Sequence, residues 1–346
     1  MYFYDKKTNE KYYTKQDLLW SKLDFRNIAS YFGEGFDSID WAKEPVESLK
    51  ELRKQRAQQL RDTYSYLVLY YGGGSDSSTV LNSFLDNNIK LDEVVISRFI
   101  DIDMPLLNGK LPLYKLLLKN YSGKITTLDF TYDSLTKYYN NQLWSQYRNT
   151  GYGKISVLLR TNLNQLAEMG IIKSIHRPSD TAHITGQSCP LIKVIDNKYY
   201  SELSCSTIGG ASFNIFSEPF FSTPKFPKLL CKESHILVNY WKEHFPTSNR
   251  IVESDHASTG IFKNLIRDEW ELKFSPLKGE NKISNFFNPN TENGAAFIAY
   301  SKKDDKKLLN LWKDSTLKEF KKVGLGLLSF TNNKSSLNKR FFISER

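Results

Sequence analysis

Three consecutive glycines, followed by small hydroxyl residues and one carboxylate, form the segment of this chain best suited to chemistry. The glycines, residues 72–74, directly follow an apolar run at 64–71, and an apolar helical pattern follows the serines. Glycines let the backbone curl with its N–H groups turned inward, and a helix N-terminus favours negative charge. Ser77 or Ser78 can cap such a helix. The order of strand, glycine turn and helix therefore predicts an anion site, typically for phosphate.

Two common nucleotide-binding motifs do not fit this loop. A Walker loop requires Gly-Lys followed by Ser or Thr, whereas the Gly-Lys pairs starting at Gly109, Gly123 and Gly153 are followed by Leu or Ile. The Rossmann fingerprint requires a glycine where this chain has Ser77. The loop carries no lysine, and Asp76 adds negative charge beside the expected phosphate. A carboxylate next to a polyphosphate is favourable when Mg²⁺ bridges the two, so the pattern indicates a magnesium-pyrophosphate site.

Six consecutive residues of this loop resemble the SGGxDS signature of the PP-loop ATP pyrophosphatases, nearest to the synthetase domain of asparagine synthetase-like enzymes. These residues are Gly72, Gly73, Gly74, Ser75, Asp76 and Ser77. Five positions match, and Gly72 stands in place of the first serine. The resemblance implies that the loop, with Ser78 beside it, binds the β- and γ-phosphates of ATP and that Asp76 binds Mg²⁺. It also implies that ATP is cleaved to AMP and pyrophosphate while a substrate oxygen is adenylated.

A second segment is similar to another nucleotide contact of this family, a strand that ends in Thr-Gly or Ser-Gly. Here the strand ends in Thr185, Gly186 and Gln187. In asparagine synthetase-like members, acidic residues that help to hold Mg²⁺ follow this turn, whereas this chain continues with Ser, Cys and Pro. Either Asp180 or another carboxylate supplies the second metal contact, or the site uses fewer ligands. An ordinary strand end with a glycine turn is the alternative interpretation.

Two pairs of residues match the family by position or spacing. Ser97 and Arg98 follow the second expected strand, where family members contact adenine and ribose. Lys263 and Arg267 resemble the Lys-x-x-x-Arg segment in the helical part of asparagine synthetase-like enzymes. There, the resemblance implies, the cations stabilise the charge that develops on the leaving pyrophosphate. A helix with exposed basic residues is the alternative interpretation of this pair.

The elements expected around these residues alternate between strands and helices. The strands are predicted at 64–71, 93–97, 124–130 and 181–187, and the helices at 46–61, 77–86, 111–120, 155–169 and 228–244. This order is typical of an α/β fold with a doubly wound parallel sheet. The resemblance implies the HUP or PP-loop type of sheet, with about five strands. Ligands bind such sheets beyond the carboxyl ends of the strands, so the loops named above are expected to meet there.

The chain is expected to contain three regions. Residues 1–60 are predicted to form a helical lead-in, residues 61–215 the ATP-binding α/β domain, and residues 216–346 a mostly helical substrate or lid region. The residues beyond 331 are predicted to be poorly structured. The lead-in is too short for a glutaminase domain, so the amine or ammonia of an amidation would come from solution or from a partner.

The composition restricts the expected cellular location and binding partners of the protein. No apolar run suggests a membrane span or a signal peptide, and the three cysteines lack the Cys-x-x-Cys spacing of zinc sites. We therefore expect a cytoplasmic protein that does not bind membranes, in the host cytoplasm if the chain is viral. The net charge of +10 leaves nucleic-acid binding open, although lysines spread over a solvated surface are the favoured explanation because no RNA-binding motif accompanies the charge. A homo-oligomer is also left open.

The sequence thus predicts a ligase that requires ATP and Mg²⁺ and forms AMP. It would adenylate a carboxylate or carbonyl oxygen for attack by an amine or ammonia, with Asp76, Lys263 and Arg267 as the catalytic residues. The sequence does not identify the acceptor. One alternative is an enzyme that modifies a nucleobase in RNA or DNA. The other is a nucleotide-binding module without catalysis, which Gly72 in place of serine and the missing acids after Gly186 would favour.

Overall fold

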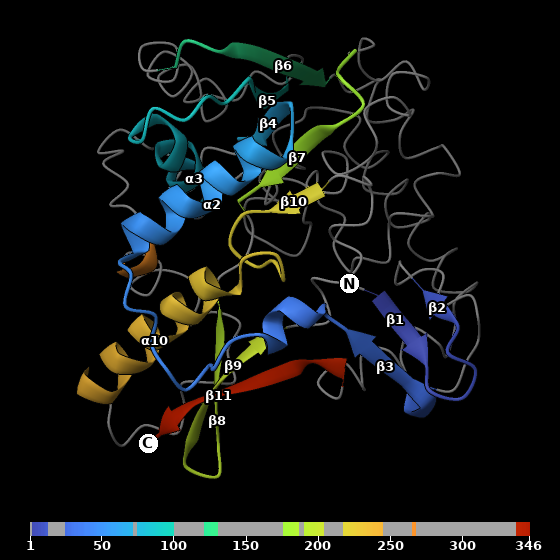
Figure 1. Ribbon diagram of the computed structural model, residues 1–346, viewed down its shortest axis with the longest axis vertical. Coiled ribbons are helices and arrows are strands. Elements are labelled where there is room, and N and C mark those ends of the chain that lie inside the picture. Colours follow the sequence, from blue (N-terminus) through green and yellow to red (C-terminus); the bar gives the residue numbers. More distant parts are fainter. Residues whose placement is uncertain are drawn as a thin grey trace, which may run out of the picture.

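The computed structural model describes a parallel sheet, two antiparallel sheets and the helices that pack on them (Figure 1). It describes residues 2–12, 25–71, 75–99, 121–130, 176–186, 190–203, 217–244, 265–267 and 337–346. The helices predicted at 111–120 and 155–169 lie outside these residues.

A five-stranded parallel sheet forms the centre of the fold. Its strands are β4 (Tyr66–Tyr70), β5 (Glu93–Phe99), β6 (Lys124–Phe130), β7 (Thr181–Thr185) and β10 (Ser217–Pro219). They lie in the order β10-β7-β4-β5-β6, and every neighbouring pair is parallel. The predicted α/β character with a parallel sheet is therefore confirmed. The strand order reverses between β4 and β7, which is where ligands bind in open α/β sheets.

Two helices, α2 (Leu49–Thr63) and α3 (Ser75–Leu85), cover one face of this sheet (Figure 1). Side chains alternate between the two faces of a strand, and those that face the helices form the first hydrophobic core. From the central strands they are Leu67, Leu69, Val94, Ile96, Ala182 and Ile184. α2 begins with a capping box, in which Ser48 and Glu51 each accept a hydrogen bond from the other's backbone N–H.

A second hydrophobic core lies between α10 (Pro227–His244) and two three-stranded antiparallel sheets. One sheet has the order β2-β1-β3 and consists of β1 (Tyr2–Asp5), β2 (Lys11–Tyr12) and β3 (Ile28–Tyr31). The other has the order β11-β9-β8 and consists of β8 (Leu191–Ile195), β9 (Lys198–Leu203) and β11 (Lys339–Glu345). Short 3₁₀ helices occur at Phe25–Asn27 and Glu34–Asp37. α10 contributes to both cores, because Leu229 packs in the first and Leu230 in the second.

The two ends of the chain differ from the sequence prediction. Within the described residues of the predicted helical lead-in, the prediction is correct for α2, whereas β1, β2 and β3 precede it. The residues predicted to be poorly structured include β11, and the described part of the C-terminal region contains β10 and β11 as well as α10. β11 pairs with β9, more than a hundred residues earlier, and such long-range pairing leaves no local pattern in the sequence.

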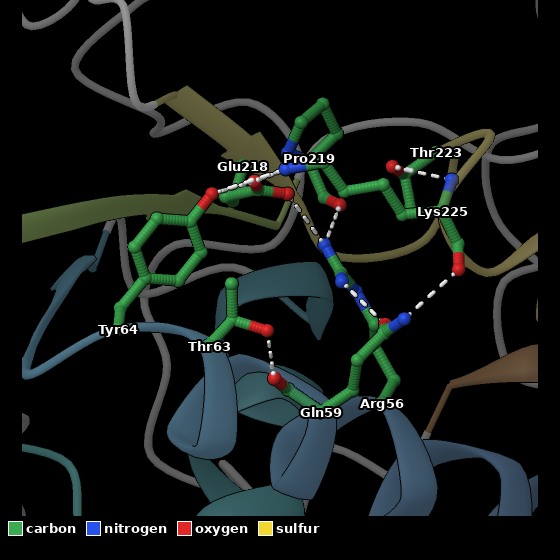
Figure 2. Close-up of polar contacts among 8 residues, drawn as sticks. All are labelled: Arg56, Gln59, Thr63, Tyr64, Glu218, Pro219, Thr223 and Lys225. Carbon is green, nitrogen blue, oxygen red and sulfur yellow. Dashed lines mark hydrogen bonds and ion pairs between the residues drawn. The ribbon is translucent and has the colours of Figure 1, made fainter. Parts of the chain in front are cut away.

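A buried polar network connects α2 to the edge strand β10 (Figure 2). Arg56 donates to the Glu218 carboxylate over 2.9 Å and to the Pro219 carbonyl over 3.1 Å. Figure 2 shows Tyr64 and Lys225 reaching the other oxygen of Glu218. Burial opposes ionisation of Glu218, but the hydrogen bonds from Lys225 and Tyr64 and the charge of Arg56 outweigh it and lower the Glu218 pKa. The network therefore holds the edge of the sheet against α2 through an ionised carboxylate.

Replacing Glu218 should strongly destabilise the fold. Glu218→Ala leaves the Arg56 guanidinium, which is 1% exposed, buried without its carboxylate. Loss of one partner of a buried pair costs about 3–5 kcal/mol of unfolding free energy. Glu47→Ala is the matched control, because it breaks an exposed 2.8 Å pair with Lys228 and should cost less than about 1 kcal/mol. Urea unfolding of both variants measures the difference, and equal losses would contradict this account of the network.

Candidate functional site

The first turn of α3 lies at the carboxyl end of β4, as the glycine motif predicts. α3 begins at Ser75 and carries Asp76 in its first turn. The capping position therefore falls within residues 72–74, outside the described part of the chain, and the two serines predicted as caps lie inside the helix. The Ser78 hydroxyl is instead 3.0 Å from the hydroxyl of Tyr71, which ties the first turn of α3 to the end of the strand.

The turn that follows β7 touches this helix start. A Cβ added at Gly186 would lie 2.9 Å from backbone atoms of Asp76 and Ser77, closer than real Cβ contacts come. Glycine permits this approach because it has no side chain. Thr185, the residue before it, is the register partner of Tyr70 on β4. The two segments that resemble nucleotide contacts therefore meet where the strand order reverses.

Arg267 also reaches Asp76, from a distant part of the chain. Its Nε donates to Asp76 Oδ1 over 2.9 Å, and its Nη1 donates to the Glu233 carboxylate on α10 and to the Ile266 carbonyl. The carbon of the guanidinium lies 3.7 Å from the centre of the Phe221 ring, and the Arg267 side chain is fully buried. A cation on an aromatic face is a favourable contact. The site thus contains a buried positive charge in direct contact with the carboxylate of the loop.

The charged residues around Arg267 come from three helices, α2, α3 and α10. Arg53 of α2 donates to the Ile266 carbonyl over 2.6 Å and so holds the short segment 265–267 in place. Glu233 of α10 is completely buried, and burial raises its pKa against the opposing effects of Arg267 and Arg53. Within the described part of the chain, Oε2 of Glu233 has no hydrogen-bond partner. The salt bridge to Arg267, an equally buried group that stays protonated, keeps Glu233 ionised in spite of this burial.

The pair predicted to contact adenine and ribose lies inside a strand. β5 continues one residue past Arg98, so Ser97 and Arg98 belong to the strand and not to the loop after it. β4 and β5 are paired as far as Tyr70 with Val95. Ser97 and Arg98 therefore extend β5 past the carboxyl end of β4, at the same edge of the sheet as the first turn of α3.

Asp180, another predicted site residue, does not lie near Asp76. Asp180, a candidate second metal ligand, precedes β7, whereas Gly186 follows it. A five-residue strand spans roughly 16 Å, so Asp180 lies at the opposite edge of the sheet, where it accepts a hydrogen bond from the Ser65 N–H. The prediction of Asp180 as the second metal ligand is therefore wrong.

Within the described ranges, no three His, Cys, Asp or Glu residues are grouped as metal ligands. The predicted site residues outside those ranges are Gly72, Gly73, Gly74, Gln187 and Lys263.

The other face of the sheet carries polar residues that no motif predicts. The Tyr70 hydroxyl lies 2.9 Å from Nδ1 of His183, which precedes Thr185 by two residues on β7. Arg177 makes two hydrogen bonds to the buried Glu93 carboxylate. Burial, reinforced by the charge of Arg177, lowers the His183 pKa to about 4. Parallel strands are usually apolar on both faces, so Glu93 and His183, polar residues inside predicted strands, are the local signals of this cluster.

Comparison of the chain with models of known protein families and with curated protein sequences found no match. Among the described helices, none is long and apolar enough to cross a membrane.

His183 should make the stability of the fold depend on pH. Its pKa in the folded state, about 4, is below the unfolded value of 6.5, so the unfolded chain binds more protons between these values. The folded state is therefore fully favoured above pH 6.5, and stability is lost as the pH falls towards 4. The loss attributable to His183 should be roughly 2–3 kcal/mol. Urea unfolding at pH 7 and pH 4.5 should show a smaller loss in His183→Gln, and equal losses would contradict the assignment.

Gly186→Ala should destabilise the contact between β7 and α3. The added methyl group meets backbone atoms of Asp76 and Ser77, which cannot rotate away as a flexible side chain can. Overpacking of this kind costs about 1–3 kcal/mol of unfolding free energy. Denaturant unfolding measures this cost. A variant as stable as the wild type would show that the turn does not press on the helix.

Proposed function

We propose that this protein is an ATP pyrophosphatase-type ligase that forms AMP and pyrophosphate. The observation that carries the proposal is the convergence on Asp76 of three segments that resemble parts of one nucleotide site. Asp76 belongs to the glycine loop, Gly186 to the Thr-Gly segment and Arg267 to the Lys-x-x-x-Arg segment. Arg267 is 191 residues from Asp76, so no local pattern forces them together.

The arrangement of the sheet supports the HUP or PP-loop type of fold. β4 is the first strand of the sheet in sequence and lies in its middle, with β5 and β6 on one side and β7 and β10 on the other. The glycine loop follows β4, and the Thr-Gly segment follows β7, its neighbour across the reversal. ATP is proposed to bind at this crevice, with its β- and γ-phosphates at the N-terminus of α3.

Asp76 fits a magnesium site of the kind that a nucleotide completes. Magnesium in such sites is held by one or two carboxylates together with the phosphates of the substrate. The Asp76 side chain is 20% exposed and lies in the first turn of α3, beside the proposed phosphates. Bound Mg²⁺ would neutralise part of the charge of the polyphosphate. Asp76 would hold the ion, and the first turn of α3 would orient the phosphates.

The reaction that this site suits is adenylation. A carboxylate or carbonyl oxygen of the acceptor attacks the α-phosphorus of ATP, the bond from that phosphorus to the β-phosphate oxygen breaks, and pyrophosphate leaves. An amine or ammonia then attacks the adenylated carbon, and AMP leaves. Negative charge develops on the departing pyrophosphate, and a buried cation such as Arg267 is suited to stabilise it. Lys263 is proposed to assist from the same segment.

Binding of ATP should depend on magnesium through Asp76. Asp76→Asn keeps the shape of the side chain but removes the charge that holds Mg²⁺, so calorimetry should show MgATP affinity at least about tenfold weaker. The matched control is Asp86→Asn, an exposed carboxylate just after α3, which should bind like the wild type.

Product analysis separates the proposed chemistry from other uses of ATP. With an acceptor found by screening carboxylates, amides and nucleobases, the wild type should release AMP and pyrophosphate. Release of ADP and phosphate would contradict the proposed function. Tight MgATP binding without turnover over the whole screen would favour a nucleotide-binding module without catalysis.

A further inference from the structure

The contact between Arg267 and Asp76 competes with the proposed metal contact of Asp76. Oδ1 of Asp76 accepts a hydrogen bond from Nε of Arg267 over 2.9 Å. A magnesium ion on the same carboxylate would place a divalent cation beside the guanidinium, and like charges at such a distance repel strongly. Binding of the metal and the nucleotide therefore favours withdrawal of the Arg267 Nε from Asp76.

Glu233 can hold Arg267 while this exchange occurs. The Glu233 carboxylate accepts from Nη1, whereas Asp76 accepts from Nε, so either bond can break without the other. The Ile266 carbonyl accepts from Nη1 as well, over 2.7 Å. The Phe221 ring lies 3.7 Å from the guanidinium carbon. Because a guanidinium carries five donors in a planar fork, a rotation that keeps Nη1 in place can redirect the remaining donors.

The burial of Glu233 distinguishes between two possible roles of this residue, stabilising the core and placing Arg267. Its side chain is 0% exposed, and a carboxylate buried on a helix costs several kcal/mol of desolvation unless a cation accompanies it. Arg267 is that cation, and it is equally buried. A leucine at this position of α10 would pack without such a cost. The carboxylate therefore fits a role in placing Arg267 better than a role in stabilising the core.

We propose that Glu233 is a positioning residue of the nucleotide site. It retains Arg267 through Nη1 while Mg²⁺ and the nucleotide take Asp76 from Nε, and the freed edge of the guanidinium then faces the phosphates. The inference rests on the proposed ATP site and adds to it a residue that no motif of the sequence contains. Without the charge of Glu233, Arg267 would pair more strongly with Asp76 and hinder the metal.

The test compares ATP binding with and without magnesium in Glu233→Gln. Calorimetry on the full chain should show MgATP affinity reduced about tenfold, because the stronger Arg267–Asp76 pair must be broken. Affinity for ATP in the presence of a chelator should be unchanged or higher, since the site has lost a negative charge. The magnesium ratio, defined as the affinity for MgATP divided by the affinity for ATP in the presence of a chelator, therefore falls. Glu243→Gln, an exposed glutamate on the same helix, is the control and should keep the wild-type ratio.

A double-mutant cycle with Arg267→Gln distinguishes positioning from a general structural effect. If Glu233 acts through Arg267, adding Glu233→Gln to Arg267→Gln should not change the magnesium ratio further. Equal changes in both affinities of Glu233→Gln, or a Glu233 effect that persists without Arg267, would overturn the proposal. If Glu233→Gln does not fold, Glu233→Asp, which shortens the reach to Nη1, should lower the ratio about threefold, and an unchanged ratio would overturn it.

The outcomes also separate this inference from the proposed function. A wild-type protein that binds MgATP, with a Glu233→Gln variant of unchanged magnesium ratio, overturns the role of Glu233 alone. A wild-type protein that binds neither form of ATP overturns both the site and the role of Glu233.

Discussion

The buried guanidinium of Arg267 is the contact on which the arrangement of the site depends. It joins Asp76 at the start of α3 to Glu233 in the middle of α10, and it lies on the Phe221 ring just beyond β10. Its own backbone segment is held to α2 by Arg53. A charged group buried at this depth requires a carboxylate partner, and the equally buried Glu233 requires Arg267 in turn. One network of charges therefore connects side chains of α2, α3 and α10 with the residues just beyond β10.

The two hydrophobic cores position the elements that carry this network. α10 contributes Leu229 to the core of the parallel sheet and Leu230 to the core of the antiparallel sheets, so neighbouring residues of one helix join the two parts. Glu233 is on the same helix, and its position follows from that double packing. The network of Arg56 and Glu218 holds β10 against α2 at the edge of the sheet. Apolar packing thus sets the positions of the elements, and buried ion pairs set the positions of the side chains near the loop.

Local patterns in the sequence predict the parallel sheet and the contacts that follow directly from it. β6 has the predicted bounds, and β4, β5 and β7 lie at the predicted positions, because a buried strand reads as an apolar run. The meeting of Gly186 with Asp76 follows from the rule that ligands bind beyond the strand ends. Glu233 has no such signal, since a glutamate in a lysine-rich helix resembles a solvated surface residue. The hairpin of β8 and β9 did have a local signal, the turn-forming pair Asp196 and Asn197. Both residues adopt positive φ angles, as a tight hairpin turn requires. The pairing of β11 with β9 depends on contacts far apart in the chain.

The most direct measurement is a crystal structure of the full chain with Mg²⁺ and an ATP analogue whose bond between the α- and β-phosphates cannot be cleaved. We expect the β- and γ-phosphates at the N-terminus of α3, beside Gly186, with the metal on Asp76. We also expect that Nε of Arg267 has left Asp76 while Nη1 still donates to Glu233. A nucleotide bound elsewhere would contradict the proposed site, and one bound at α3 with the contact between Arg267 and Asp76 intact would contradict the role of Glu233.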